Sequence, residues 1–177
     1  MTLMHSFPST SIDQYKTLAR TWAATVTVVT VRRTEAAIAV GAPELDGFTA
    51  TAFFTVSMAP PIIAISATSA SSALAMLRDA RGFAVNLLAP DQQDVAGSFA
   101  RPAVERVGLW EKLAWTGDHA GVPLLHGGTG AFSAGIRQLV DAGDHTLVLG
   151  DVTAIHLGEG SDTLVYHNRG YGRVVRT

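Results

Sequence analysis

Two adjacent prolines, Pro60 and Pro61, separate two stretches that both have the composition of β-strands. Before them, residues 48–57 interleave aromatic side chains with small hydroxyl residues, and after them residues 62–65 are wholly apolar. Consecutive prolines remove backbone N–H donors and fix φ, so they exclude a helix or a central strand that runs through this point. The sequence therefore predicts a strand or loop, a bend at the prolines, and then a buried strand.

Small hydroxyl residues gather on both sides of the predicted buried strand. Thr49 and Thr51 precede it, Ser66 and Thr68 end it, and a helical pattern begins at Ser71. A helix N-terminus presents free N–H groups and a favourable dipole, so these hydroxyls and the helix start together suit a phosphate. Ordinary strand threonines and an N-cap serine would account for the same residues without any ligand.

The segment from Thr49 to Pro61 resembles a signature of the small flavin reductases, which bind FMN or FAD in a split β-barrel. Three other segments resemble the same family: the strand pattern at 25–30, the Gly-x-Pro-Leu-Leu run at 121–125 and the Gly-Asp-His-Thr motif at 143–146. The resemblance implies an NAD(P)H:flavin oxidoreductase. Members of this family often supply reduced flavin to a partner monooxygenase.

The rest of the chain favours the fold that this resemblance implies. Residues 131–140, 146–157 and 164–167 have strand patterns separated by turn-forming residues, whereas helical patterns are few. Residues 36–40 are expected to resume the strand pattern after a polar turn. We therefore expect a mainly β protein with flanking helices, an antiparallel split β-barrel.

Composition limits the domain count and the classes of partner. The 177 residues suit one domain, 1–177, with a core at about 21–173 and an N-terminal arm and helix at 1–20. Hydrophobic residues make up 47% and charged residues only 16%, which favours an oligomer, and the resemblance implies a homodimer. The formal net charge of −2, without a basic run, argues against nucleic acid or a membrane as a partner. Residues 1–10 lack the pattern of a signal peptide, so we expect a cytoplasmic protein.

The resemblance also implies which residues hold the two nucleotides. Arg169 would supply a cation for the phosphate, because the hydroxyl-rich stretch has no Lys or Arg of its own. His145 would have the one direct role, in which it orients the flavin and the nicotinamide. The predicted cofactor-binding residues are Thr49, Ala50, Thr51, Ala52, Ser66, Ala67, Thr68, Ser71, Ser72, Asn86, Arg169 and Tyr171.

Several of these residues also have a purely structural interpretation. Asn86 interrupts an apolar strand and needs hydrogen-bond partners, which a neighbouring loop could supply. His145 could bond backbone groups in its turn, and Tyr171 could be a core or interface aromatic. Ala73 departs from the threonine that the family typically has at this position.

The expected cofactors are FMN, with FAD as the alternative, and NADH or NADPH as the co-substrate. Two other functions stay open: a flavoprotein of this fold that keeps its flavin and reduces another substrate, and a flavin- or haem-binding protein without turnover. We expect no metal site, because the chain has no cysteine and its six histidines show no close ligand spacing. No Rossmann or P-loop glycine motif occurs in a suitable context.

Overall fold

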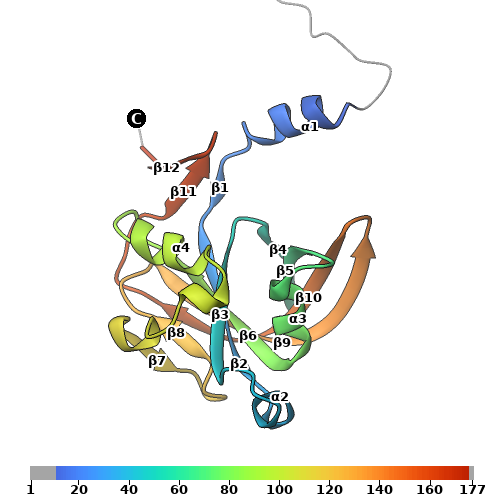
Figure 1. Ribbon diagram of the computed structural model, residues 1–177. Helices are drawn as coiled ribbons and strands as arrows, with labels where there is room; N and C mark the ends of the chain where they lie inside the picture. Colours follow the sequence, from blue (N-terminus) through green and yellow to red (C-terminus); the bar gives the residue numbers. More distant parts are fainter. Residues whose placement is uncertain (1–10, 176–177) are drawn as a thin grey trace, which may run out of the picture.

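A seven-stranded antiparallel sheet, with short helices around it, dominates the computed structural model (Figure 1). The structure describes residues 11–175; residues 1–10, on which the expected lack of a signal peptide rests, lie outside this range, as do the last two. In chain order the elements are α1 (Ile12–Ala19), β1 (Ala24–Thr25), β2 (Thr27–Arg33), α2 (Glu35–Ala39), β3 (Leu45–Ala50), β4 (Phe53–Met58), β5 (Pro61–Thr68), α3 (Ser72–Arg78), β6 (Ala80–Leu87), α4 (Gln93–Phe99), the 3-10 turns η1 (Ala103–Glu105) and η2 (Trp110–Lys112), β7 (Trp115–Gly117), β8 (Pro123–Leu125), β9 (Gly130–Ala142), β10 (His145–Leu157), β11 (Leu164–His167) and β12 (Gly170–Arg173).

The two edge strands of the large sheet are consecutive in the chain. The strand order is β3-β2-β6-β9-β10-β5-β4, and Thr51 and Ala52 alone separate β3 from β4. The Ser66 N–H donates to the Ala52 carbonyl at 2.9 Å, so β5 also holds this short link. The sheet thus curls until its edges meet at residues 51–52. This arrangement confirms the predicted antiparallel split barrel with flanking helices.

The predicted bend at the double proline is confirmed. Strand β4 ends at Met58, β5 begins at Pro61, and these two residues pair across the turn. Pro61 stands first in its strand, a position where a missing N–H donor is tolerated. Ile63 and Ile65 of β5 are buried, as their apolar run predicts.

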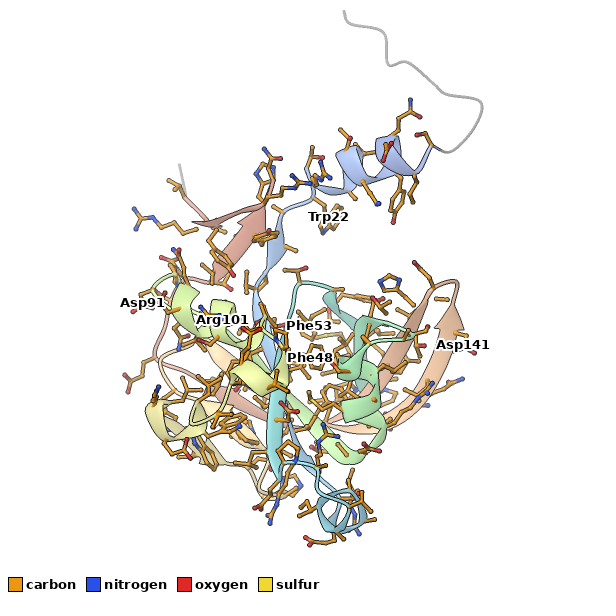
Figure 2. The ribbon with its side chains drawn as sticks, in the orientation of Figure 1. Trp22, Phe48, Phe53, Asp91, Arg101 and Asp141 are labelled. Carbon is orange, nitrogen blue, oxygen red and sulfur yellow. The ribbon has the colours of Figure 1, made fainter. Side chains whose placement is uncertain are left out.

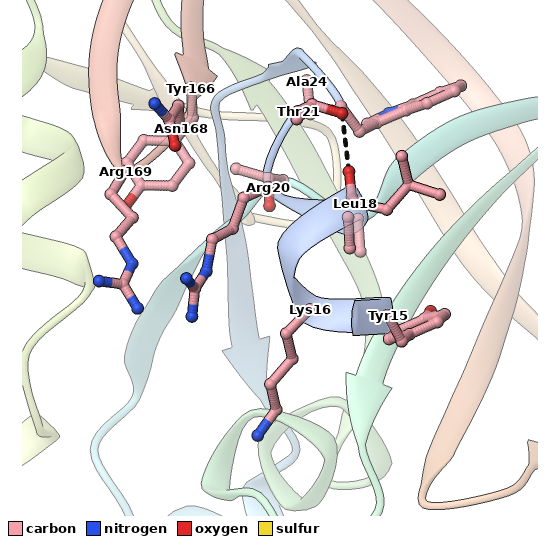
Figure 3. Close-up of a pocket in the computed structure, with 13 residues that line it drawn as sticks. Tyr15, Lys16, Leu18, Arg20, Thr21, Ala24, Tyr166, Asn168 and Arg169 are labelled. Atoms are coloured by element: carbon pink, nitrogen blue, oxygen red, sulfur yellow. Dashed lines mark hydrogen bonds between the residues drawn. The ribbon is translucent and has the colours of Figure 1, made fainter. Parts of the chain in front are cut away.

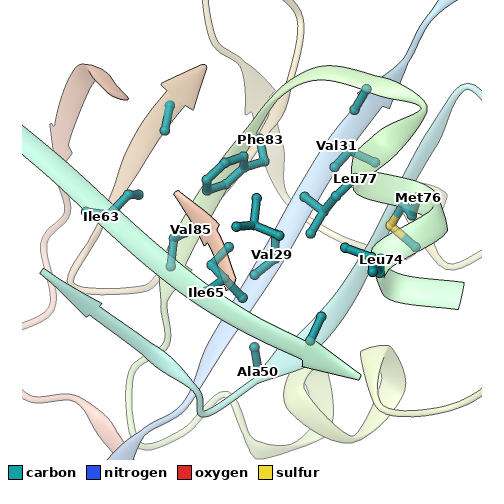
Figure 4. Packing of buried hydrophobic residues seen from close by; sticks show 14 residues of the cluster. Val29, Val31, Ala50, Ile63, Ile65, Leu74, Met76, Leu77, Phe83 and Val85 are labelled. Carbon is teal, nitrogen blue, oxygen red and sulfur yellow. The ribbon is translucent and has the colours of Figure 1, made fainter. Parts of the chain in front are cut away.

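The barrel interior is filled by aliphatic side chains from opposite walls (Figure 4). Val29 and Val31 of β2 meet Ile63, Ile65 and Phe83, all of which are fully buried. Helix α3 closes one side of this core with Leu74, Met76 and Leu77. Burying side chains of this size contributes about 1.5–3 kcal/mol each, and this burial fixes the backbone that carries the hydroxyl residues.

A buried ion cluster holds the irregular segment 101–113 against the outside of the barrel. The Asp46 carboxylate contacts Arg33 at 3.2 Å and Arg106 at 3.0 Å, and each of the three side chains is about nine-tenths buried. Arg106 also donates to the Gly47 carbonyl and lies over the Phe99 ring. We call Asp46, Arg33 and Arg106 the Asp46 cluster.

The prediction of a strand at residues 36–40 is wrong, because this segment forms the short helix α2. The Thr34 side chain accepts a hydrogen bond from the Ala37 N–H, which caps the helix start, and alanine-rich sequence then favours the helix.

Helix α1 extends away from the barrel and buries none of its residues (Figure 2). Trp22, just beyond it, is 78% exposed. Within residues 11–175, no helix combines the length and the apolar character needed to cross a bilayer.

Candidate functional site

A small pocket opens where the two sheet edges meet. It has a volume of about 250 Å³ and lies between the β3–β4 link, the end of β5 and the start of α3. We call it the hydroxyl cleft. Its walls are Phe48, Thr49, Ala50, Thr51, Ala52, Ser66, Ala67, Thr68, Ser71 and Ala73. The two hydroxyl-rich segments, which are separate in sequence, therefore face one cavity, and most of the predicted cofactor-binding residues line it.

The hydroxyl groups around the cleft fall into two kinds. Thr49 donates to the Ala96 carbonyl at 2.6 Å, and Ser71 donates to the Thr68 carbonyl while it caps α3. These groups are used to hold the fold. The hydroxyls of Thr51 and Ser66, by contrast, have no side-chain hydrogen bond among residues 11–175, so they can bind a ligand.

The cleft is suited to a flat polar molecule. Ala50, Ala52, Ala67 and Ala73 contribute only methyl groups to its walls, which leaves room for a ring to approach the backbone. Hydroxyl donors stand beside them, as a ribityl chain and a phosphate require. The residues present therefore fit a flavin.

His145 stands at the rim of this cleft. It begins β10 opposite Thr68, and its Nε2 lies 3.4 Å from the Thr68 hydroxyl. Its Nδ1 lies 2.7 Å from an Asp144 carboxylate oxygen, and 43% of the imidazole is exposed. The hydrogen bond and the charge of His145 hold the pKa of Asp144 below its usual value of 3.8. Asp144 thus orients the imidazole, and Nε2 faces the hydroxyl of Thr68, a residue of the cleft wall.

Four of the predicted cofactor-binding residues, Ser72, Asn86, Tyr171 and Arg169, lie apart from the cleft walls. Ser72 follows Ser71 as the first residue of α3. Asn86 is 2% exposed: its Nδ2 donates to the Val28 carbonyl and to Thr30, and its Oδ1 accepts from Leu125. The Asn86 amide is therefore engaged between β2, β6 and β8, in accordance with its structural interpretation. Tyr171 packs edge-on against Tyr166 with ring centroids 5.5 Å apart.

Arg169 lines a second and larger pocket, which shares Thr51 and Ala52 with the hydroxyl cleft (Figure 3). This pocket has a volume of about 970 Å³, and we call it the arm pocket. Its other walls are residues of α1, the segment that follows α1, and the β11–β12 hairpin. Arg169 stands beside Asn168 in the hairpin turn, both with positive φ, of 67° and 47° respectively.

The sequence interpretation overlooked Lys16 and Arg20, which also line the arm pocket. A cation on a short exposed helix is usually a solvated surface residue, so neither residue stood out. Their spacing of four residues places them on one side of α1, which is the one signal that could have found them.

Comparison with known proteins agrees with this geometry. Residues 19–174 match the family described as flavin reductase like domain. An NADH:FMN oxidoreductase of Rhodococcus qingshengii is 37% identical over 131 residues, which are 72% of this chain and 67% of that protein. The reductase component of 4-hydroxyphenylacetate 3-monooxygenase from Thermus thermophilus is 32% identical over 163 residues, covering 92% of this chain and 97% of the relative.

A solved structure has the same fold. The NADH:FAD oxidoreductase SgcE6 of Streptomyces globisporus, in complex with NAD and FAD fragments, superimposes with a TM-score of 0.79 at 27% identity, over 92% of each chain. The predicted resemblance is thus confirmed from sequence and from structure. The chain belongs to the family of flavin reductase like domains.

Proposed function

We propose that this protein reduces free flavin with NADH or NADPH. One observation carries the proposal: the split of the barrel holds a cleft with unengaged hydroxyls and small walls, and an oriented imidazole stands at its rim. The relative named NADH:FMN oxidoreductase supports FMN and NADH as the preferred pair. FAD is the second acceptor, since a structural neighbour was solved with FAD fragments.

In the reaction, the nicotinamide C4 gives a hydride, with its two electrons, to N5 of the oxidised flavin. The protein contributes position, because two rings held at near-attack distance react without a side-chain acid or base at the hydride step. Thr51 and Ser66 would bind the ribityl and phosphate oxygens. His145, held by Asp144, would orient the flavin edge and the nicotinamide carboxamide.

The test is oxidation of NADH and NADPH by flavin-stripped protein, with and without FMN or FAD in excess. Turnover that rises with free flavin supports a reductase that releases its product. Turnover that requires only bound flavin and another acceptor would point to a flavoprotein that keeps its flavin. Flavin binding without oxidation of either nucleotide would contradict the proposal.

We further infer that the protein is a homodimer through β4. Phe54, Val56 and Met58 alternate along this edge strand and are 49%, 49% and 90% exposed, which is unusual for a row of large apolar side chains. A second copy would cover this row next to the hydroxyl cleft. Sedimentation should give twice the chain mass, and Val56→Lys should give the monomer mass.

The reductase components among the relatives support a partner monooxygenase that consumes the reduced flavin. We propose one domain over 1–177 with its core at about 21–173, because one sheet and its buried core contain elements from β2 to β10. A cytoplasmic location is proposed because NAD(P)H, the donor, is found there. Coupled product formation with a flavin-dependent oxygenase would test the partner role.

A further inference from the structure

Three cations from two chain segments meet on the arm pocket. Lys16 and Arg20 belong to the end of α1, and Arg169 belongs to the β11–β12 turn. Figure 3 shows all three side chains extending toward the same side of the pocket. Among residues 11–175, none of the three has a carboxylate within ion-pair distance.

A backbone hydrogen bond places the turn that carries Arg169 beside Arg20. The Asn168 N–H donates to the Arg20 carbonyl at 2.9 Å, which ties the hairpin turn to the end of α1. Arg169 occupies a turn position with a φ of 67°, where glycine is strongly preferred. The backbone alone would favour glycine at position 169, yet an arginine stands there. A ligand contact made by the guanidinium would offset the conformational cost of this residue.

Fold stability does not account for the three cations together. The dipole of α1 favours positive charge at its C-terminal end, which would explain Lys16 or Arg20. The dipole does not explain Arg169, which belongs to the β11–β12 hairpin and is repelled by the positive charges of Lys16 and Arg20. Unpaired cations that converge on a pocket are instead typical of a site for a phosphorylated ligand.

The arm pocket continues into the hydroxyl cleft, because Thr51 and Ala52 line both. Aromatic side chains, Tyr15, Trp22 and Tyr166, also line the arm pocket and can pack against a purine. We infer that the arm pocket binds the adenosine diphosphate half of a dinucleotide, with the diphosphate on Lys16, Arg20 and Arg169. The inference rests on the proposed function, in which the redox-active half of that molecule occupies the hydroxyl cleft.

NAD(P)H and FAD both contain adenosine diphosphate, so either could supply this half. NADH differs from reduced nicotinamide mononucleotide by the adenosine and one of the two phosphates, because the mononucleotide keeps the other phosphate. FAD differs from FMN in the same way. Kinetics with these four compounds therefore assign the pocket to the donor or to the acceptor.

The first experiment measures binding without turnover. ADP-ribose is titrated calorimetrically into the full chain, the Arg20→Ala/Arg169→Ala double variant, and the control Arg81→Gln/Lys112→Gln, whose exposed cations lie outside the arm pocket. We expect the double variant to raise Kd about tenfold or more and the control to leave it unchanged. Added salt should weaken binding to the wild type more than to the double variant. Equal Kd values, or no binding to the wild type, would overturn the inference.

The second experiment separates the two sources. With FMN as acceptor, a donor site predicts that the double variant raises KM for NADH about tenfold and raises KM for reduced nicotinamide mononucleotide by much less, because the mononucleotide keeps only one of the two phosphates. With the mononucleotide as donor, an acceptor site predicts a larger rise in KM for FAD than for FMN. Unchanged KM values in both series would contradict the inference. If no donor were oxidised, the proposed function would fail, while the ADP-ribose titration would still judge the pocket.

Discussion

The Asp46 cluster and the arm pocket both bring cations together, but they differ in what neutralises the charge. Arg33 and Arg106 contact one buried carboxylate, so the chain itself balances much of their charge. The three cations of the arm pocket, Lys16, Arg20 and Arg169, are exposed. No carboxylate of the described residues forms an ion pair with them. The Asp46 cluster holds the segment 101–113 against the barrel. The three cations of the arm pocket hold no part of the described fold together through an ion pair.

The same distinction applies to the hydroxyls of the cleft. Ser71 is engaged in a helix cap, and Ser66 is not engaged by any side-chain hydrogen bond in the described part of the chain. Polar groups that the fold uses should therefore affect stability when they are removed, and polar groups that it leaves unengaged should affect binding.

The largest effect is expected at Asp46. Asp46→Asn removes the buried carboxylate from Arg33 and Arg106. Arg106 then has no counter-charge among the described residues, and Arg33 keeps only the half-exposed Asp79 at 3.0 Å. We expect the free energy of unfolding to fall by about 3–5 kcal/mol, measured by urea denaturation. Glu44→Gln, which breaks the exposed pair with Arg32, is the control and should change it by less than about 1 kcal/mol. Similar losses in both variants would contradict the role of burial.

The next prediction contrasts Ser66 and Ser71, of which one is expected to affect flavin binding and the other the stability of the fold. Ser71→Ala should lower the free energy of unfolding by about 1 kcal/mol, because it removes the cap of α3. Ser66→Ala should leave unfolding unchanged and raise KM for FMN by about threefold to tenfold. Thermal melts and steady-state kinetics of both variants test this pair. A stability loss in Ser66→Ala with normal KM would reverse the assignment.

Arg169→Gly should have opposite effects on stability and binding. Glycine relieves the positive φ at the hairpin turn, so the free energy of unfolding should rise by about 0.5–1 kcal/mol. Affinity for ADP-ribose should fall at the same time. Arg169→Ala is the matched control, since it loses the guanidinium but keeps a Cβ at this φ. If Arg169→Gly and Arg169→Ala melted at the same temperature, the backbone argument would be wrong.

The smallest effect concerns Asp144 and pH. Its pKa is lowered by His145, so the carboxylate is favoured in the folded state. The ionised Asp144 therefore stabilises the folded state fully at a pH above 3.8, the ordinary pKa of an aspartate. This contribution to the free energy of unfolding is lost as the pH falls through the lowered pKa. Carboxyl ¹³C chemical shifts should follow this titration. In His145→Ala the pKa should return toward 3.8, and an unchanged value would show that the imidazole is not the cause.

The sequence predicted the barrel and the hydroxyl cleft because both depend on local patterns. The double proline, the apolar run after it and the turn residues identify strands, and hydroxyl residues on neighbouring strand ends come together once those strands pair. Asn86 shows the limit of this reasoning. An amide in an apolar strand fits both a ligand contact and a core hydrogen bond, and only the folded structure shows that Asn86 bonds to Val28, Thr30 and Leu125.

The arm pocket could not be predicted in the same way. It depends on how α1 and the β11–β12 turn approach each other, and these segments are about 150 residues apart in sequence. The strand predicted at residues 36–40 failed for a more local reason. The β-branched residues Ile38 and Val40 suggest an extended chain, but Thr34 caps a helix start, accepting hydrogen bonds from Ala37 at its hydroxyl and from Ile38 at its carbonyl.

The position of Thr51 and Ala52 between the two ends of the sheet implies that flavin binding depends on complete folding. The hydroxyl cleft exists only when both ends of the sheet have come together, so the unfolded chain has no such site. A flavin that binds the folded form alone stabilises it by mass action, by about 2.7 kcal/mol at one hundred times Kd. Flavin supply would then set the fraction of the chain that escapes proteolysis, and a cell short of flavin would hold less of the enzyme that consumes NAD(P)H to reduce it.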